Sequence, residues 1–87
     1  MAVTTVQSPA TAAVVALARY VERDPERVGG VPVFRGSRVP VKSLFDHLQA
    51  SDALETFLDD FPGVTREQAE GVIDLAGRHL IAEVPTR

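Results

Sequence analysis

The 87-residue chain contains no cysteine, so disulfide bonds, thiolate metal sites and cysteine nucleophiles are excluded. It also lacks a long apolar run. The stretch at residues 14–18 is far shorter than the roughly 20 residues of a membrane-spanning helix, and no basic segment precedes it. We therefore expect a cytoplasmic protein that has no contact with a membrane.

The charges that are present divide unevenly along the chain. Residues 1–40 carry five arginines and three acidic residues, whereas residues 41–87 carry four basic and nine acidic residues. Because an acidic surface repels phosphate, any nucleic-acid surface is expected in the N-terminal half. At 87 residues the chain is one small domain with a marginal core, so we expect it to associate, as a homodimer or in a complex.

Glycine and proline are concentrated between residues 24 and 41, which indicates a segment with a specific backbone conformation, because glycine permits positive φ and proline fixes φ. Segments 31–34 and 38–39 flank Gly36-Ser37, a pair suited to a tight turn in which the glycine takes positive φ. We expect a short hairpin there. Its strands are short or lie at an edge, because Pro32 and Pro40 have no N–H to donate.

Two readings of the residues before this hairpin stay open. Ser8-Pro9 is a helix-start signal, and apolar residues recur at helical spacing after it, but the alternation around Val21 also suits a strand. Asp24-Pro25-Glu26 predicts a capped helical turn, which residues 29–30, both glycine, would stop.

From Val41 onward the pattern is helical. Apolar residues predict one helix from residue 41 to 48, and a second that starts at Asp52, with Glu55 reaching back, and ends at residues 62–63. Thr65 and Gln68 form a capping-box pair for a third helix. The remaining predicted features of that helix are a hydrophobic staple, Val64 with Ala69, and an apolar stripe: Ala69, Val72, Ile73, Ala76 and Leu80.

These elements predict a mainly α-helical domain with a short β-hairpin, a tri-helical or winged helix-turn-helix-like fold. We divide the chain into an apolar N-terminal extension at residues 1–18, the domain at 19–80 and a tail at 81–87. The extension carries no charge, and we expect Leu17 within it to contact a second copy.

A characteristic set of glycines, prolines and one arginine occurs in a fixed order over about residues 19–80. The set is Asp24, Pro25, Gly29, Gly30, Pro32, Gly36, Arg38, Val39, Pro40 and Val41, then Phe61-Pro62 and Thr65-Arg66-Glu67-Gln68. This ordered set resembles the bacterial and archaeal family of domain of unknown function 433. Ser37 stands where that family usually has threonine, which keeps a hydroxyl in the turn, and residues 50–52 lack the glycine often found there.

The resemblance implies a winged or tri-helical DNA-binding fold. Members of the family are often assigned as antitoxins of VapB type, encoded beside PIN-like nucleases. Fold and gene neighbourhood do not fix function, so both implications are expectations for this chain.

The candidate DNA-binding residues come from the hairpin and from the helix starts. Arg35, at the hairpin tip, is expected to reach phosphate, whereas for Arg38 we favour a structural pair with an acidic side chain such as Asp46. The candidate set is Arg35, Arg38, Lys42, Ser43, Arg66 and Gln68.

The candidate partner-binding residues are Leu17 of the extension and three acids of the third helix, Glu67, Glu70 and Asp74. The acids repel phosphate, and they form either a solvated face or a surface for a basic partner. No catalytic set, metal site, cofactor or small-molecule substrate is expected, because His47 and His79 lack further ligands at helical spacing and Ser37 has no paired base.

The resemblance, together with these observations, leads us to expect an antitoxin, not an enzyme. It would neutralise a PIN-like nuclease toxin by direct binding and repress its own operon by binding operator DNA. The alternative is an accessory protein-interaction module without DNA binding, which the acidic pI of about 5.2 favours.

Overall fold

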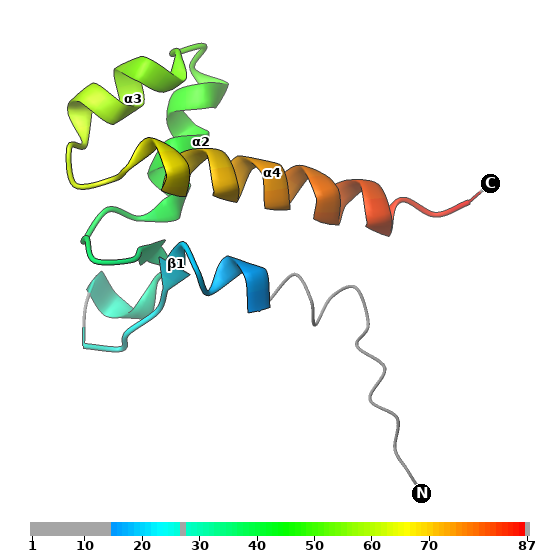
Figure 1. Ribbon diagram of the computed structural model, residues 1–87, viewed down its shortest axis with the longest axis horizontal. Helices are drawn as coiled ribbons and strands as arrows, with labels where there is room; N and C mark the ends of the chain where they lie inside the picture. The colour runs from blue at the N-terminus through cyan, green and yellow to red at the C-terminus, as the bar shows by residue number, and fades with distance from the viewer. Residues whose placement is uncertain (1–14, 27, 87) are drawn as a thin grey trace, which may run out of the picture.

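The computed structural model describes residues 15–26 and 28–86. Within them, α2 (Val41–Gln49), α3 (Leu54–Asp60) and α4 (Arg66–Glu83) accompany two short strands, β1 (Val21–Glu22) and β2 (Val33–Phe34). A 3-10 turn, η1 (Val28–Gly30), lies between the strands. In Figure 1, α3 lies above α4 and β1 below it, and α2 crosses behind the N-terminal part of α4, while the C-terminal half of α4 projects beyond them. The expected mainly helical fold with a small antiparallel sheet is confirmed.

The strand that pairs with β2 differs from the expected one. β2 pairs antiparallel with β1, in the register Val21↔Phe34, so the strand reading around Val21 is correct. The segment after the turn adds only an isolated bridge, Val33↔Pro40. Two backbone hydrogen bonds flank this bridge, and because Pro32 and Pro40 have no N–H, the pairing extends no further.

The tight turn after β2 is centred one residue earlier than the sequence suggests. The Ser37 N–H donates to the Phe34 carbonyl at 2.9 Å, which makes Arg35 and Gly36 the central pair. Gly36 has φ of 80°, as expected, because the third position of such a turn requires positive φ. The Ser37 hydroxyl donates to the Phe34 carbonyl at 2.8 Å and accepts from the Val39 N–H at 3.0 Å.

The segment between the strands begins as expected. The Asp24 carboxylate accepts a hydrogen bond from the Glu26 N–H at 2.9 Å and so caps a turn. Gly29 and Gly30 have φ of 64° and 83°, and they lie inside η1, whereas the sequence placed them after the turn.

The start of α3 corrects another prediction. Its N-cap is Ala53, without a side-chain cap, and not Asp52. The Asp52 N–H donates to the His47 carbonyl at 2.9 Å, so this residue belongs to the C-terminal closure of α2. Ser51, with φ of 69°, makes the sharp change of direction that the absent glycine would otherwise provide.

The start of α4 follows the sequence closely. The Thr65 N–H donates to the Gln68 side-chain oxygen and the Gln68 N–H donates to the Thr65 hydroxyl, both at 3.0 Å, which completes the capping box. Val64 and Ala69 are both buried beside it. The predicted apolar stripe, however, leaves the core before the helix ends, because Leu80 is 66% exposed.

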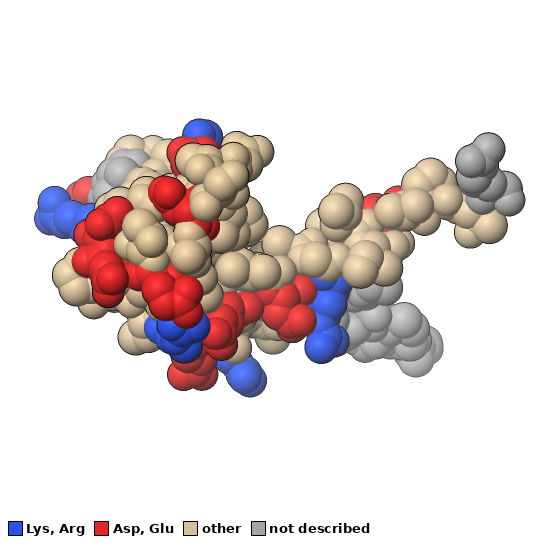
Figure 2. All heavy atoms as spheres, turned by 90° about the horizontal axis from the view of Figure 1, so that it is seen from above, with Lys and Arg blue, Asp and Glu red and all other residues tan. Residues whose placement is uncertain are grey.

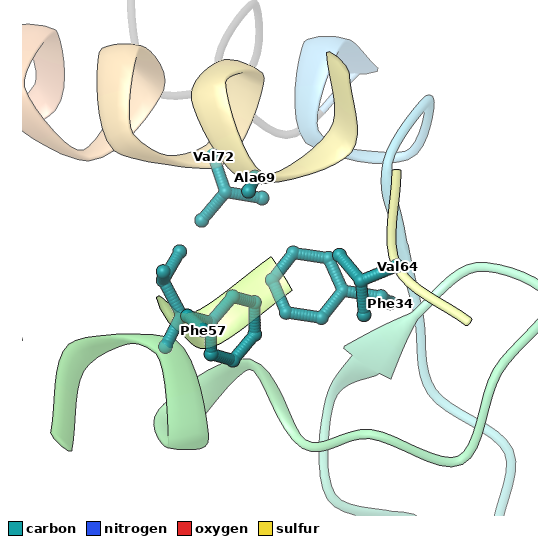
Figure 3. Close-up of a cluster of buried hydrophobic side chains, with 6 residues drawn as sticks. Phe34, Phe57, Val64, Ala69 and Val72 are labelled. Atoms are coloured by element: carbon teal, nitrogen blue, oxygen red, sulfur yellow. The ribbon is translucent and has the colours of Figure 1, made fainter. Parts of the chain in front are cut away.

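The core lies where the N-terminal half of α4 covers β2, α2 and α3. Figure 3 shows Val72 and Ala69 of α4 above Phe34 and Phe57, with Val64 beside Phe34. The Phe34 and Phe57 ring centroids are 6.1 Å apart. Burial of a large apolar side chain contributes about 1.5–3 kcal/mol. This small cluster therefore fixes the hairpin and the three helices relative to one another.

Candidate functional site

Arg35 is held by the fold on two sides. Its Nε donates to the Ala18 carbonyl at 3.0 Å and its Nη1 lies 3.6 Å from a Glu22 carboxylate oxygen. Its own carbonyl accepts a hydrogen bond from the Gln68 side-chain amide at 2.9 Å. Two candidate DNA-binding residues are thus brought together, and both connect the hairpin to neighbouring elements.

Arg38, in contrast to Arg35, is not held by hydrogen bonds from its side chain within the described residues. The expected pair with Asp46 is absent, because Lys42 occupies that carboxylate with Nζ–O distances of 2.9 and 3.0 Å. Arg38 is exposed and forms no ion pair or side-chain hydrogen bond within residues 15–26 and 28–86. The structural role therefore belongs to Arg35, and the free guanidinium at the hairpin belongs to Arg38.

The other candidate DNA-binding residues are also engaged within the domain. Arg66 donates to Glu55 of α3 at 2.9 Å and to Glu70 of α4 at 3.1 Å. These hydrogen bonds raise the pKa of Arg66 and lower the pKa of Glu55. Ser43, which is half-buried in the first turn of α2, accepts a bond from the His47 ring at its backbone carbonyl. Lys42 and Arg66 are thus paired with acidic side chains of the domain.

Acidic side chains dominate the exposed faces of α3 and α4. The segment from residue 54 to 83 contains seven acidic and two basic residues. Arg66 and Arg78 offset part of this charge, Arg78 through a 2.9 Å bond to Asp74. Glu67 is exposed and forms no ion pair within the described residues. In Figure 2, Asp and Glu atoms gather on the left-hand part of the face seen from above, with a few Lys and Arg atoms beside them.

The projecting end of α4 carries apolar side chains that the sequence pattern assigned to the core or passed over. Leu80 and Ile81 are 66% and 76% exposed, and Val84, at the C-cap that follows the helix, is 64% exposed. The signal that could have identified them is helix length, because α4 is 18 residues long while its buried side chains end at Val72. The core is too small to cover the rest of the helix.

His47 connects α2 to α3. Its Nδ1 lies 3.0 Å from the Ser43 carbonyl and its Nε2 lies 3.3 Å from a carboxylate oxygen of Asp60. The Ser43 hydrogen bond raises the pKa of His47 and the Asp60 carboxylate adds to this, while partial burial acts in the opposite direction. The ring also packs edge-on against Phe57 and Phe61. Asp60 of α3 therefore helps to join the two helices.

The expected dimer contact falls mostly outside the described residues, which begin at residue 15. Leu17 is half-buried at the end of a helical turn over residues 15–17, and its carbonyl accepts a hydrogen bond from the Tyr20 N–H at 2.9 Å. Within the described part of the chain, no helix could span a membrane, and no group of three or more potential metal ligands occurs.

The glycine, proline and turn geometry of residues 21–41, followed by the capped helix α4, is the pattern on which a family assignment depends. A family model of proteins of unknown function, DUF433, matches residues 21–76. The chain belongs to this family. No curated protein and no solved structure matches the chain. Within the DUF433 match lie Arg35, Gln68 and the serine hydroxyl at position 37, all of which build the hairpin and its attachment to α4.

Proposed function

We propose that this DUF433 protein is an antitoxin that binds a PIN-like ribonuclease and blocks it without turnover. The acidic surface of α3 and α4 is the observation that carries the proposal. A nuclease that binds RNA presents basic side chains to phosphate, and an acidic protein surface is complementary to them. Occupation of that basic surface would exclude the RNA.

The ion pairs inside the acidic surface leave it available for such a partner. The pairs of Arg66 with Glu70 and of Arg78 with Asp74 are exposed at spacing i,i+4. Exposed pairs of this kind contribute at most about 1 kcal/mol. Their exchange for contacts with a partner therefore costs little, and their net negative charge would speed the encounter with a basic protein.

Co-expression with a PIN-like nuclease, sought first in the gene neighbourhood, tests the proposal. The protein should relieve the growth arrest that the nuclease causes. Replacement of Glu67, Glu70 and Asp74 by lysine should slow association and leave the domain folded. Unrelieved growth arrest with a soluble antitoxin, or a metabolic gene neighbourhood without a nuclease, would support the accessory interaction module in its place.

Operator binding is a second candidate function, and Arg38 favours it. Its guanidinium is free within the described residues and lies beside the hairpin turn, in the half of the chain that carries net positive charge. Arg19 and Arg23 are also exposed, and neither forms an ion pair within residues 15–26 and 28–86. Replacement of Arg38 by alanine should weaken operator binding and reduce its salt dependence by roughly one counterion.

A homodimer through the N-terminal extension would present two such arginine-bearing hairpins to an operator. Leu17→Asp should lower the dimer fraction, because a carboxylate is strongly disfavoured in an apolar interface. Light scattering on the wild type at micromolar concentration measures this directly, and a monomer there would contradict the dimer.

A further inference from the structure

The apolar stripe of α4 that faces the core continues past the end of the core. Ala69 is buried, and Ile73 packs against the core cluster. Residues three or four apart share a helix face, so the stripe continues from Ile73 through Ala76 and Leu80. Leu80 is nevertheless exposed, as is Val84 at the C-cap that follows the helix. The same face is thus covered in the N-terminal half of α4 and uncovered in the C-terminal half.

The two halves of α4 also differ in charge. Residues 66–74 carry three acidic side chains and one basic, whereas residues 75–84 carry one of each. The basic one, Arg78, is bonded to Asp74 of its own helix. The C-terminal half therefore attracts neither a basic nor an acidic partner strongly, and a second copy of it would meet it without repulsion. Its grouped, exposed apolar side chains indicate an interaction surface.

The domain itself limits how a second copy can lie on this face. The core occupies the stripe along the N-terminal half of α4, so a parallel partner in register would need the same space for its own domain. An antiparallel partner overlaps only the half that projects past the domain (Figure 1). Its own domain then lies at the far end of the pair.

The antiparallel arrangement also keeps the acidic halves apart. With Leu80 of both copies at the centre and a rise of 1.5 Å per residue, the two Asp74 residues lie about 18 Å apart along the axis. This distance is about twice the Debye length at physiological ionic strength, so their repulsion is largely screened.

We propose that the C-terminal half of α4 pairs antiparallel with the same segment of a second copy, about a two-fold axis at Leu80. Ala76 of each copy then lies at the level of Val84 of the other. Such a pairing closes on itself and gives a dimer, not an open chain. The contact goes beyond the proposed function, and it is separate from the one expected through Leu17.

Sedimentation equilibrium over a range of protein concentrations tests the proposal. Leu80→Asp should raise the dissociation constant of the dimer by roughly tenfold or more, because it places a carboxylate in an apolar contact. Leu80 is exposed, so the variant should still fold, which circular dichroism checks. The matched control is Ala82→Asp, which adds the same charge to an exposed position about 200° around the helix. It should leave the dissociation constant unchanged.

Introduced cysteines test the antiparallel arrangement, because the natural chain has none. An equal mixture of Ala76→Cys and Val84→Cys should form a mixed disulfide under mild oxidation, since the two positions lie at the same level. Val84→Cys alone should cross-link far less, because its two copies would lie about 12 Å apart along the axis.

Three results would overturn the proposal. The first is a wild type that stays monomeric over the whole concentration range. The second is a dimer that Leu17→Asp dissociates and Leu80→Asp does not, which would assign the contact to the N-terminal extension. The third is preferential cross-linking of Val84→Cys with itself, which would indicate a parallel pair. None of these measurements involves a nuclease, so the proposed antitoxin function is tested separately.

Discussion

Tyr20 packs against Gly71 so closely that a Cβ atom on this glycine would lie 2.5 Å from the tyrosine ring. The segment before β1 therefore contacts α4 at a position where the helix has no side chain. Together with the hydrogen bond from Gln68 to Arg35, this contact attaches the N-terminal part of the domain to α4.

The first prediction compares two glycines of the same helix. Alanine is favoured over glycine in a helix interior by about 1 kcal/mol. Gly77→Ala should therefore raise the free energy of unfolding by up to that amount, since its surroundings are open. Gly71→Ala should instead lower it by about 1–3 kcal/mol through overpacking against Tyr20. Urea denaturation measures both, and equal stabilisation of the two variants would show that Tyr20 does not pack there.

The second prediction separates the two hairpin arginines by stability. Arg35→Ala removes the bond to the Ala18 carbonyl and should lower the free energy of unfolding by about 0.5–1.5 kcal/mol. Arg38→Ala should change it by less than about 0.5 kcal/mol, as for an exposed side chain without partners in the described structure. Thermal denaturation of the two variants provides the comparison. A larger loss for Arg38→Ala would restore the structural role that the sequence suggested.

The third prediction concerns the hydroxyl in the hairpin turn. Ser37→Ala removes both side-chain hydrogen bonds and should destabilise the domain by about 1–2 kcal/mol. Ser37→Thr keeps the hydroxyl and matches the residue usual in the family, so its free energy of unfolding should stay within about 0.5 kcal/mol of the wild type. Equal losses in both variants would mean that the turn does not depend on the hydroxyl.

The fourth prediction is a pH dependence through His47, whose pKa is raised in the folded state. A group with a raised folded pKa contributes its full stabilisation below its unfolded pKa, about 6.5, and loses it as pH rises through the folded value. The stability difference between wild type and His47→Gln should therefore be larger near pH 5.5 than near pH 8. In an NMR titration, Asp60→Asn should lower the pKa of His47. If the stability difference between wild type and His47→Gln does not change with pH, folding does not raise the pKa of His47.

The sequence predicted those parts of the fold that depend on local chemistry. The capping box of Thr65 and Gln68, the positive φ of Gly36 and the limits of α2 all follow from residues within one turn of each other. The choice of β1 as the partner of β2 depends on contacts more than ten residues apart, so periodicity alone left it open.

The side-chain roles were harder to predict, because they depend on competition between neighbours. Asp46 could pair with Lys42 or with Arg38, which is eight residues away, and helical i,i+4 spacing gives it to Lys42. Arg35 reaches Ala18 only because the hairpin folds back on the N-terminal segment. Leu80 fits the apolar stripe, but the small core ends before it.

The measurement that tests the central claim most directly is a titration of nuclease activity. A purified PIN-like nuclease, sought first among the products of the neighbouring genes, cleaves RNA while increasing amounts of this protein are added, at a nuclease concentration well above the dissociation constant. Stoichiometric neutralisation predicts a linear fall in cleavage that ends at a fixed protein-to-nuclease ratio, and the same end point after long incubation. Undiminished cleavage at a large excess of folded protein would contradict the antitoxin account.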